Sequence, residues 1–162
     1  MTRDPISEAH RQWVAHGWAG AADGMAMVTS VVRAQQLLME RIDAVLRPRG
    51  LTFARYEVLR LLSFTRDAAM PMSRLGSLRQ VHPTSVTSAV DRLVAQGYVE
   101  RVRSDEDKRV VRAVLTDAGR DAVEEATDAL NREVFEVPGL PEGDVRELTD
   151  RLTGLRSGLG DV

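Results

Sequence analysis

The chain contains no cysteine, and only seven of its 162 residues are aromatic. Disulfides, thiolate metal sites and cysteine-based redox sensors are therefore excluded. The three histidines, His10, His16 and His82, lack the spacing of metal ligands, so neither a metal nor another cofactor is expected. No apolar run approaches the roughly 20 residues that span a bilayer. The first residues also lack the basic and then apolar pattern of a signal peptide, which makes a cytoplasmic location the expectation.

Signatures of catalysis are missing as well. The sequence shows no paired nucleophile and base, no glycine-rich phosphate loop and no metal-binding cluster, so an enzyme is not expected. A length of 162 residues is enough for one compact domain with a substantial core.

Positive charge is concentrated in the middle of the chain. Residues 71–120 contain nine Arg or Lys against six Asp or Glu, whereas the remainder contains thirteen against eighteen. The net charge of the whole chain is −2, which by itself argues against nucleic-acid binding. A basic centre between acidic ends instead favours one face that binds phosphate.

Residues 83–116 are the most informative stretch, and they begin with a short predicted helix. Pro83 suits the first helical position, and Gly97 suits a left-handed helix end. Apolar residues fall on one side of this helix, while the other side is short and rich in hydroxyl groups. The polar side and its flanks consist of Thr84, Ser85, Thr87, Ser88, Asp91, Arg92 and Ala95. Such a face indicates close approach to a binding partner.

Two valine-rich segments, residues 98–103 and 110–115, predict the strands of a hairpin with a charged turn. Before the polar helix, residues 73–80 predict another short helix, and Val81 and His82 form the connection. Two helices joined by a short turn and followed by a hairpin make a winged helix-turn-helix. In that arrangement the second helix enters a DNA major groove and the wing reaches a neighbouring minor groove.

The remaining segments predict a mainly α fold with the hairpin as its only β structure. Helices are expected over 5–17, 25–46, 52–64 and 117–135, and in the last twenty residues. The expected organisation is an N-terminal extension with dimerisation helices (1–50), a DNA-binding lobe (51–116) and C-terminal dimerisation helices (117–162) within one compact domain.

Two features of the helical parts have alternative interpretations. Trp13 and Trp18 either anchor the N-terminal helix to the body or form the wall of a ligand pocket. Glu57 either forms an exposed ion pair with Arg60, three residues on, or is a half-buried acid beside a pocket.

An apolar stripe runs along the last helix at alternating intervals of three and four residues. It consists of Val145, Leu148, Leu152, Leu155 and Leu159. So narrow a seam suits packing against another helix. Packing within the same chain is one interpretation, but the terminal position favours a partner subunit.

Residues 85–119, SVTSAVDRLVAQGYVERVRSDEDKRVVRAVLTDAG, resemble the multiple-antibiotic-resistance regulator (MarR) family of winged-helix transcription factors. The family pattern D-x-R-x-x-x-[IV]-x-L-T is matched by Asp107, Arg109, Leu115 and Thr116, whereas Ala113 stands where Val or Ile is usual. The resemblance extends in order from about residue 25 to residue 159. The N-terminal helix with Trp13 looks like the added helix of the family's urate-responsive branch.

The resemblance implies roles for individual residues. Five residues of the polar helix lie in or along the major groove: Thr84, Ser85, Thr87, Ser88 and Arg92. Arg109 enters the minor groove, and Arg103, Lys108 and Arg112 contact phosphates. Asp91 aims Arg109 by pairing with it, and Asp107 helps to orient the wing. By analogy with the urate-responsive branch, Trp13, Tyr56 and Glu57 are candidates for an effector site.

The function implied is that of a nucleoid-associated homodimer on double-stranded DNA. It binds a pseudo-palindromic operator, usually as a repressor, and a small phenolic or carboxylate effector modulates binding. An alternative is a winged-helix module for protein–protein contact, which fits the overall acidity. Neither interpretation involves a membrane.

Overall fold

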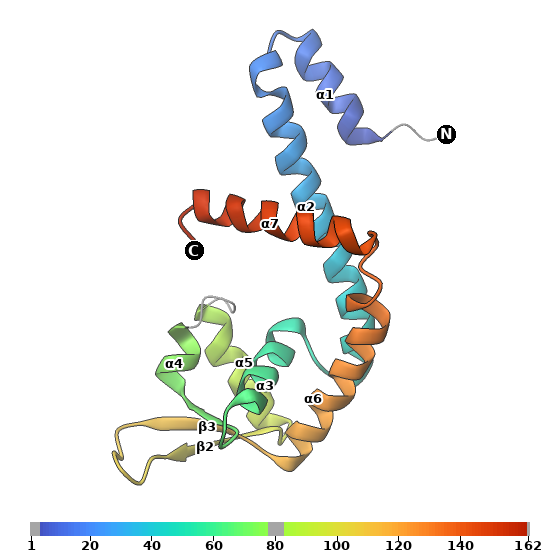
Figure 1. Ribbon diagram of the computed structural model, residues 1–162. Helices are drawn as coiled ribbons and strands as arrows, with labels where there is room; N and C mark the ends of the chain where they lie inside the picture. The colour runs from blue at the N-terminus through green and yellow to red at the C-terminus, as the bar shows by residue number, and fades with distance from the viewer. Residues whose placement is uncertain (1–3, 78–82, 162) are drawn as a thin grey trace. The chain divides into compact units, whose positions relative to one another are not determined.

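The structure is a computed structural model that describes residues 4–77 and 83–161, apart from the side chains of residues 83–85. It is mainly helical, with one small sheet (Figure 1). Contacts between residues divide the chain into two compact units, Met1–Ala44 and Val45–Val162. None of the described helices is both long enough and apolar enough to cross a membrane.

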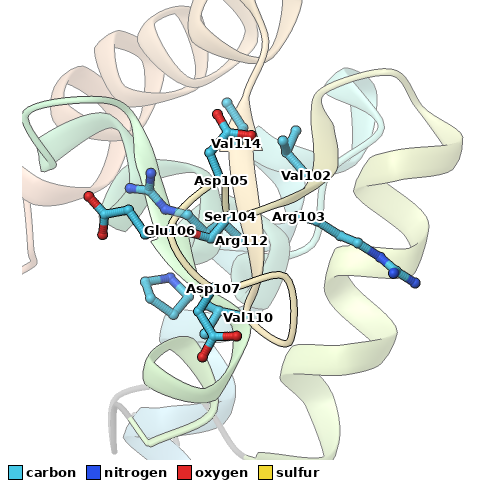
Figure 2. A pocket seen from close by; sticks show the side chains of 10 residues that line it. Val102, Arg103, Ser104, Asp105, Glu106, Asp107, Val110, Arg112 and Val114 are labelled. Carbon is cyan, nitrogen blue, oxygen red and sulfur yellow. The ribbon is translucent and has the colours of Figure 1, made fainter.

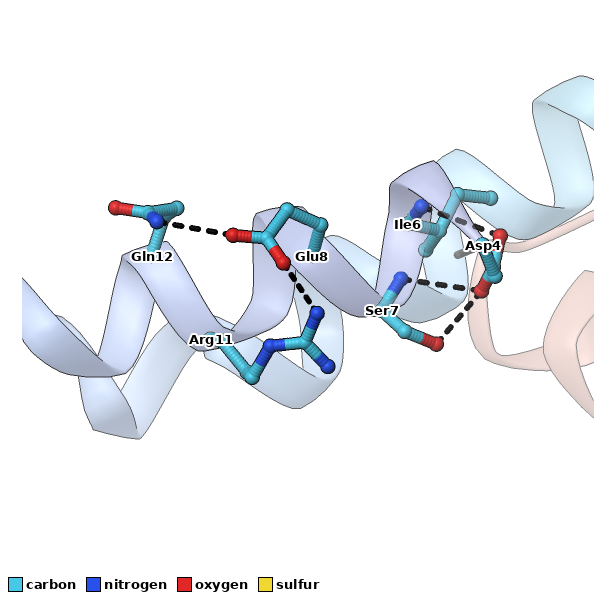
Figure 3. Close-up of polar contacts among 6 residues, drawn as sticks. All are labelled: Asp4, Ile6, Ser7, Glu8, Arg11 and Gln12. Carbon is cyan, nitrogen blue, oxygen red and sulfur yellow. Dashed lines mark hydrogen bonds and ion pairs between the residues drawn. The ribbon is translucent and has the colours of Figure 1, made fainter. Parts of the chain in front are cut away.

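The first unit contains helix α1 (Pro5–Ala15) and most of helix α2 (Ala19–Leu46). As predicted, Asp4 caps α1: its carboxylate accepts hydrogen bonds from the backbone N–H groups of Ile6 and Ser7 (Figure 3). Gly17 then has a φ of +88°, which turns the chain into α2. Helix α2 begins six residues before the expected start, because its first six residues, AGAADG, show no apolar periodicity from which a helix could be predicted.

The second unit is built around α3 (Phe53–Phe64), as the sequence predicted. Thr52 Oγ1 accepts a hydrogen bond from the N–H of Arg55 and caps this helix, which follows a short 3₁₀ turn (Arg47–Arg49). Helix α3 packs against α5 (Pro83–Ala95), α6 (Asp117–Leu130) and the sheet (Figure 1). The largest fully buried side chains of α3 are Leu59 and Leu62.

The sheet has three antiparallel strands in the order β1-β3-β2. Strands β2 (Val99–Arg103) and β3 (Val111–Leu115) form the predicted hairpin. Strand β1 (Ala69–Pro71) was not predicted; it pairs with β3 and runs directly into helix α4 (Met72–Ser77). The sequence predicts a loop at this segment, because three residues are too few to show the alternation of a strand.

Helix α6 begins close to the first residues of the hairpin. Thr116 Oγ1 accepts a hydrogen bond from the N–H of Gly119 at 3.0 Å and donates one to the Gly97 carbonyl at 2.7 Å. This hydroxyl therefore joins the end of α5 to the start of α6. Helix α6 continues into a π-helical turn (Asn131–Phe135), in agreement with the predicted helix end.

Helix α7 (Glu142–Gly158) is the last helix. Its apolar stripe is largely exposed in the single chain: Leu148 is 44% exposed, Leu152 38% and Leu159 77%. None of its residues is buried. The expectation that this stripe packs on a partner subunit therefore remains open to a direct test.

Candidate nucleic-acid interface

Helix α5 separates apolar and polar residues as its sequence predicts. Val86, Val90 and Leu93 are buried, whereas the polar face is exposed. The exposed residues of that face are Thr87, Ser88, Asp91 and Arg92. Thr84 and Ser85 contribute backbone to α5, and their side chains lie outside the described part of the structure. Packing through one side of α5 thus leaves short polar side chains on the other.

Strand β2 presents two arginines toward α5. Side chains alternate along a strand, so Arg101 and Arg103 share a face with the buried Val99, and β2 packs against α5. Figure 2 shows the Arg103 side chain extending toward the yellow-green helix α5. The polar face of α5 therefore continues onto one face of the wing.

The acid of this face pairs with a different arginine from the one expected. Asp91 Oδ1 lies 2.7 Å from Arg101 Nη1, so the predicted pairing of Asp91 with Arg109 is wrong for this structure. The reason is positional: Arg101 lies on a strand that packs against α5, whereas Arg109 lies in the loop at the end of the hairpin. Arg101 was not among the predicted site residues. Its alternation with Val99 is the signal that could have identified it.

The wing tip is a tight turn organised by Asp107. Its carboxylate accepts a hydrogen bond from the N–H of Arg109 at 2.9 Å, and its carbonyl accepts one from the N–H of Val110 at 2.9 Å. The tip closes where the N–H of Ser104 donates to the Val110 carbonyl, also at 2.9 Å. Lys108 and Arg109 are exposed on this turn. Asp107 thus fixes the backbone from which Arg109 projects.

Val102, Arg112 and Val114 lie on the opposite face of the sheet and line a pocket of about 560 Å³, which extends to the wing tip (Figure 2). Its lining residues are Pro71, Val102, Arg103, Ser104, Asp105, Glu106, Asp107, Val110, Arg112 and Val114. Arg112, predicted to contact phosphate, forms an ion pair with Asp67. The hydrogen bond from Arg112 holds the pKa of Asp67 below its ordinary value of 3.8. Asp67 was not singled out in the sequence, because 45 residues separate it from its partner.

Comparison with known proteins identifies this architecture. A family model described as the MarR family matches residues 49–110. Sco5413, a MarR family transcriptional regulator from Streptomyces coelicolor, is 44% identical in sequence. Its structure superposes with a TM-score of 0.75, covering 86% of this chain and 96% of Sco5413. The chain belongs to the MarR family.

Two further relatives support this assignment. Sco3205, a MarR family regulator from Streptomyces coelicolor solved in complex with DNA, is 25% identical, with a TM-score of 0.73 over 85% of this chain and 88% of Sco3205. The HTH-type transcriptional regulator PrsX of Escherichia coli is 28% identical over 117 residues, which is 72% of this chain and 70% of PrsX. These relatives are transcriptional regulators, so this MarR-family chain is a DNA-binding regulator and not an enzyme.

Two of the candidate effector residues of this MarR-family chain lie on α3. The Tyr56 hydroxyl is within 3.1 Å of Thr127 Oγ1 on α6, and Tyr56 itself is buried. Glu57 is half-buried, and burial raises the pKa of its carboxyl group. An exposed Glu57–Arg60 pair was one interpretation of the sequence, but Arg60 pairs instead with Glu124 at 2.8 Å. The half-buried acid is therefore the better description of Glu57.

Trp13, the third candidate, belongs to the first unit. Its ring contacts that of Trp18 edge-on, with 5.4 Å between centroids. Trp18 is more than half exposed. Within the described residues the two tryptophans therefore stabilise the turn between α1 and α2, and the role of Trp13 in an effector site stays a prediction. Among the residues that the structure describes, no cluster of three or more His, Asp or Glu side chains is suited to a metal ion.

Proposed function

We propose that the chain acts as a homodimeric, sequence-specific regulator that binds a pseudo-palindromic operator. The observation that supports this most directly is the continuity between the exposed hydroxyl face of α5 and the arginine-bearing face of β2. A helix placed in the major groove presents such short side chains to base edges and phosphates, while the wing follows the adjacent backbone. Sco3205, which was solved with DNA, has the same fold.

Each residue of this face has a defined role in the proposal. Thr87, Ser88 and Arg92 contact base edges or phosphates in the major groove, and Thr84 and Ser85 extend this contact toward the start of α5. Arg109 enters the narrow and strongly negative minor groove. Arg103 and Lys108 bind phosphates. Arg112 contributes less than the sequence implied, because Asp67 neutralises its charge.

The exposed apolar stripe of α7 supports the proposed dimer. Leu148 and Leu152 on α7, and Leu159 directly after its last residue, are spaced by four and seven residues and are substantially exposed in one chain. A second copy that covers this stripe removes it from water. A two-fold axis then sets two α5 helices about one DNA turn apart, which is the spacing that a pseudo-palindromic operator requires.

Repression and its release complete the proposal. A dimer on an operator excludes other proteins from that DNA. A small phenolic or carboxylate effector weakens binding when it favours an arrangement of the dimer that fits DNA poorly, typically by about 1–3 kcal/mol of coupling. Tyr56 and Glu57 of α3 are the candidate contacts, because Glu57 is a half-buried acid and the Tyr56 hydroxyl is a polar group within the helical part of the fold. Trp13 remains a third candidate.

Selection from a random duplex library tests the DNA-binding part of this function. The expected result is an enriched inverted repeat, bound by a species that sedimentation velocity identifies as a dimer. A failure to enrich any sequence would refute the proposal and favour the protein–protein module. Screening phenols and small carboxylates for release of the selected duplex then tests the effector.

Arg109→Ala tests the role of the wing in the same assay. We expect about 1–3 kcal/mol weaker binding, which is roughly five- to 150-fold, because the minor-groove contact is lost. Arg146→Ala on α7 is the matched control, since it removes the same charge from an arginine that is 74% exposed and lies away from α5 and the wing in the sequence. Equal affinities of Arg109→Ala and wild type at fixed salt would remove the wing tip from the mechanism.

A further inference from the structure

Asp91 is a negative charge on the face of α5 that the proposed function places against DNA. Its carboxylate is exposed, with 56% of the side chain accessible. A bare carboxylate at this position repels the phosphate backbone, and the repulsion is strong where the approaching DNA displaces water. The structure therefore has to neutralise this charge or orient it away from phosphate.

Arg101 lies within ion-pair distance of that carboxylate. Its Nη1 is 2.7 Å from Asp91 Oδ1, and 35% of its side chain remains accessible. The guanidinium group is always protonated, so Arg101 places a full positive charge beside the Asp91 carboxylate. The strand position also matters, because β2 packs directly against α5.

We propose that Arg101 is a positioning residue of the DNA-binding face. Arg101 cancels the charge of Asp91 and holds its carboxylate so that it does not repel the phosphate backbone. This inference rests on the proposed function, since it requires the polar face of α5 to meet DNA. It differs from a purely mechanical role of the pair in one respect: Arg101 is needed because Asp91 is charged, and not because the bond between them shapes the wing.

The other charges on this surface agree with the proposed role. Arg92 on α5 and Arg103 on β2 are exposed, and neither forms an ion pair with any residue that the structure describes. They remain available for phosphate. Arg101 is the arginine that pairs with the acid of this face, Asp91. The unpaired arginines leave the face positively charged as a whole.

A double-substitution cycle separates charge cancellation from shape. The variants are Arg101→Gln, Asp91→Asn and the two combined, with affinity measured for the duplex that the wild-type protein selects. We expect Arg101→Gln to weaken binding about tenfold, because it exposes an uncompensated carboxylate to phosphate. Asp91→Asn should bind at least as tightly as wild type. The double variant should recover to within about threefold of wild type, since neither charge remains.

Further variants guard against a folding defect and against an effect of overall charge. Arg101→Lys retains the positive charge and should retain most of the affinity. Melting temperatures should change little throughout, because exposed ion pairs contribute little to stability. Glu142 and Arg146 form an i,i+4 ion pair on α7 with an N–O distance of 3.2 Å. Glu142→Gln and Arg146→Gln change the net charge of the protein as Asp91→Asn and Arg101→Gln do, and neither should shift affinity by more than about twofold.

The possible outcomes distinguish a failure of the proposed function from a failure of this inference. If the wild-type protein selects no duplex, the proposed function falls and this inference with it. If it does select one, but Asp91→Asn binds as weakly as Arg101→Gln and the double variant does not recover, the pair acts through shape and the inference is wrong. An effect of Arg146→Gln as large as that of Arg101→Gln would overturn it in favour of net charge.

Discussion

Gly119→Ala should destabilise the protein, although it replaces a helical glycine with the best helix former. Gly119 lies in the first turn of α6 and is buried. A Cβ added there meets the Tyr98 carbonyl oxygen at 2.1 Å and the Leu115 Cδ1 atom at 2.9 Å. Ordinary van der Waals contact begins near 3.4 Å, so the added carbon requires α6 or the first residues of the hairpin to move.

The magnitude follows from two opposing effects. The intrinsic preference of Ala over Gly in a helix favours the variant by about 1 kcal/mol. Overpacking typically destabilises by about 1–3 kcal/mol, and the upper end applies because the obstacle is backbone. The Tyr98 carbonyl also accepts a hydrogen bond from the N–H of Thr116 at 3.1 Å, which opposes its displacement. The net loss is about 2 kcal/mol, or about 4–8 °C in melting temperature for a chain of this length.

Gly154→Ala provides the matched control within α7. Gly154 is exposed and a Cβ there meets nothing within 4 Å, so the same substitution should stabilise by about 0.4–1 kcal/mol. Both variants are measured by thermal and urea unfolding at one fixed protein concentration, because the proposed dimer would make stability depend on concentration. If Gly119→Ala melts at or above the wild-type temperature, the close approach of α6 to the hairpin does not constrain the fold.

Two other substitutions test contacts within the second unit, Val45–Val162. Asp67→Asn should lower stability only at pH values where Asp67 is ionised. Hydrogen bonding from Arg112 lowers the pKa of Asp67 from 3.8 in the folded state. The contribution of the ionised Asp67 to stability is therefore complete above pH 3.8 and is lost as the pH falls through the pKa of the folded state. Melting temperatures of this variant and wild type should therefore differ at pH 7 and converge as the pH falls below 3.8, whereas a constant difference would contradict the ion-pair explanation. Thr116→Val should destabilise by about 0.5–2 kcal/mol in urea unfolding, because it removes the N-cap acceptor of α6 and the donor to the Gly97 carbonyl. Thr116→Ser should restore most of this stability, and a Ser variant no better than Val would exclude the hydroxyl as the cause.

The parts of the fold that the sequence predicted depend on interactions between near neighbours. Thr52 and Thr116 mark helix starts because their hydroxyl groups accept hydrogen bonds from N–H groups three residues away. Gly97 marks the end of α5 because its φ of +75° is one that other residues rarely adopt. The helices and the hairpin followed from such signals, and the hydroxyl face of α5 followed from its period.

The features that were missed depend on residues far apart in the sequence. Strand β1 exists because Ala69 pairs with Val114, and nothing within three residues of Ala69 indicates that partner. The pairing of Arg60 with Glu124 and that of Arg112 with Asp67 span 64 and 45 residues. Sequence reasoning placed these arginines beside near neighbours or on DNA, because it could count charges but could not assign partners to them.

Ion pairing also explains how a chain with net charge −2 suits a polyanion. Two of the acids in and near the DNA-binding unit, Asp67 and Asp91, each pair with an arginine, and Asp107 turns its carboxylate toward the wing backbone. Carboxylates bonded in this way hold neighbouring arginines or the wing backbone in place, and they repel phosphate less than free carboxylates would. The arginines at positions 92, 103 and 109 form no ion pair with any described residue and remain available for DNA. The local field at the interface is therefore set by which charges are paired, and the total charge of the chain is a poor guide to it.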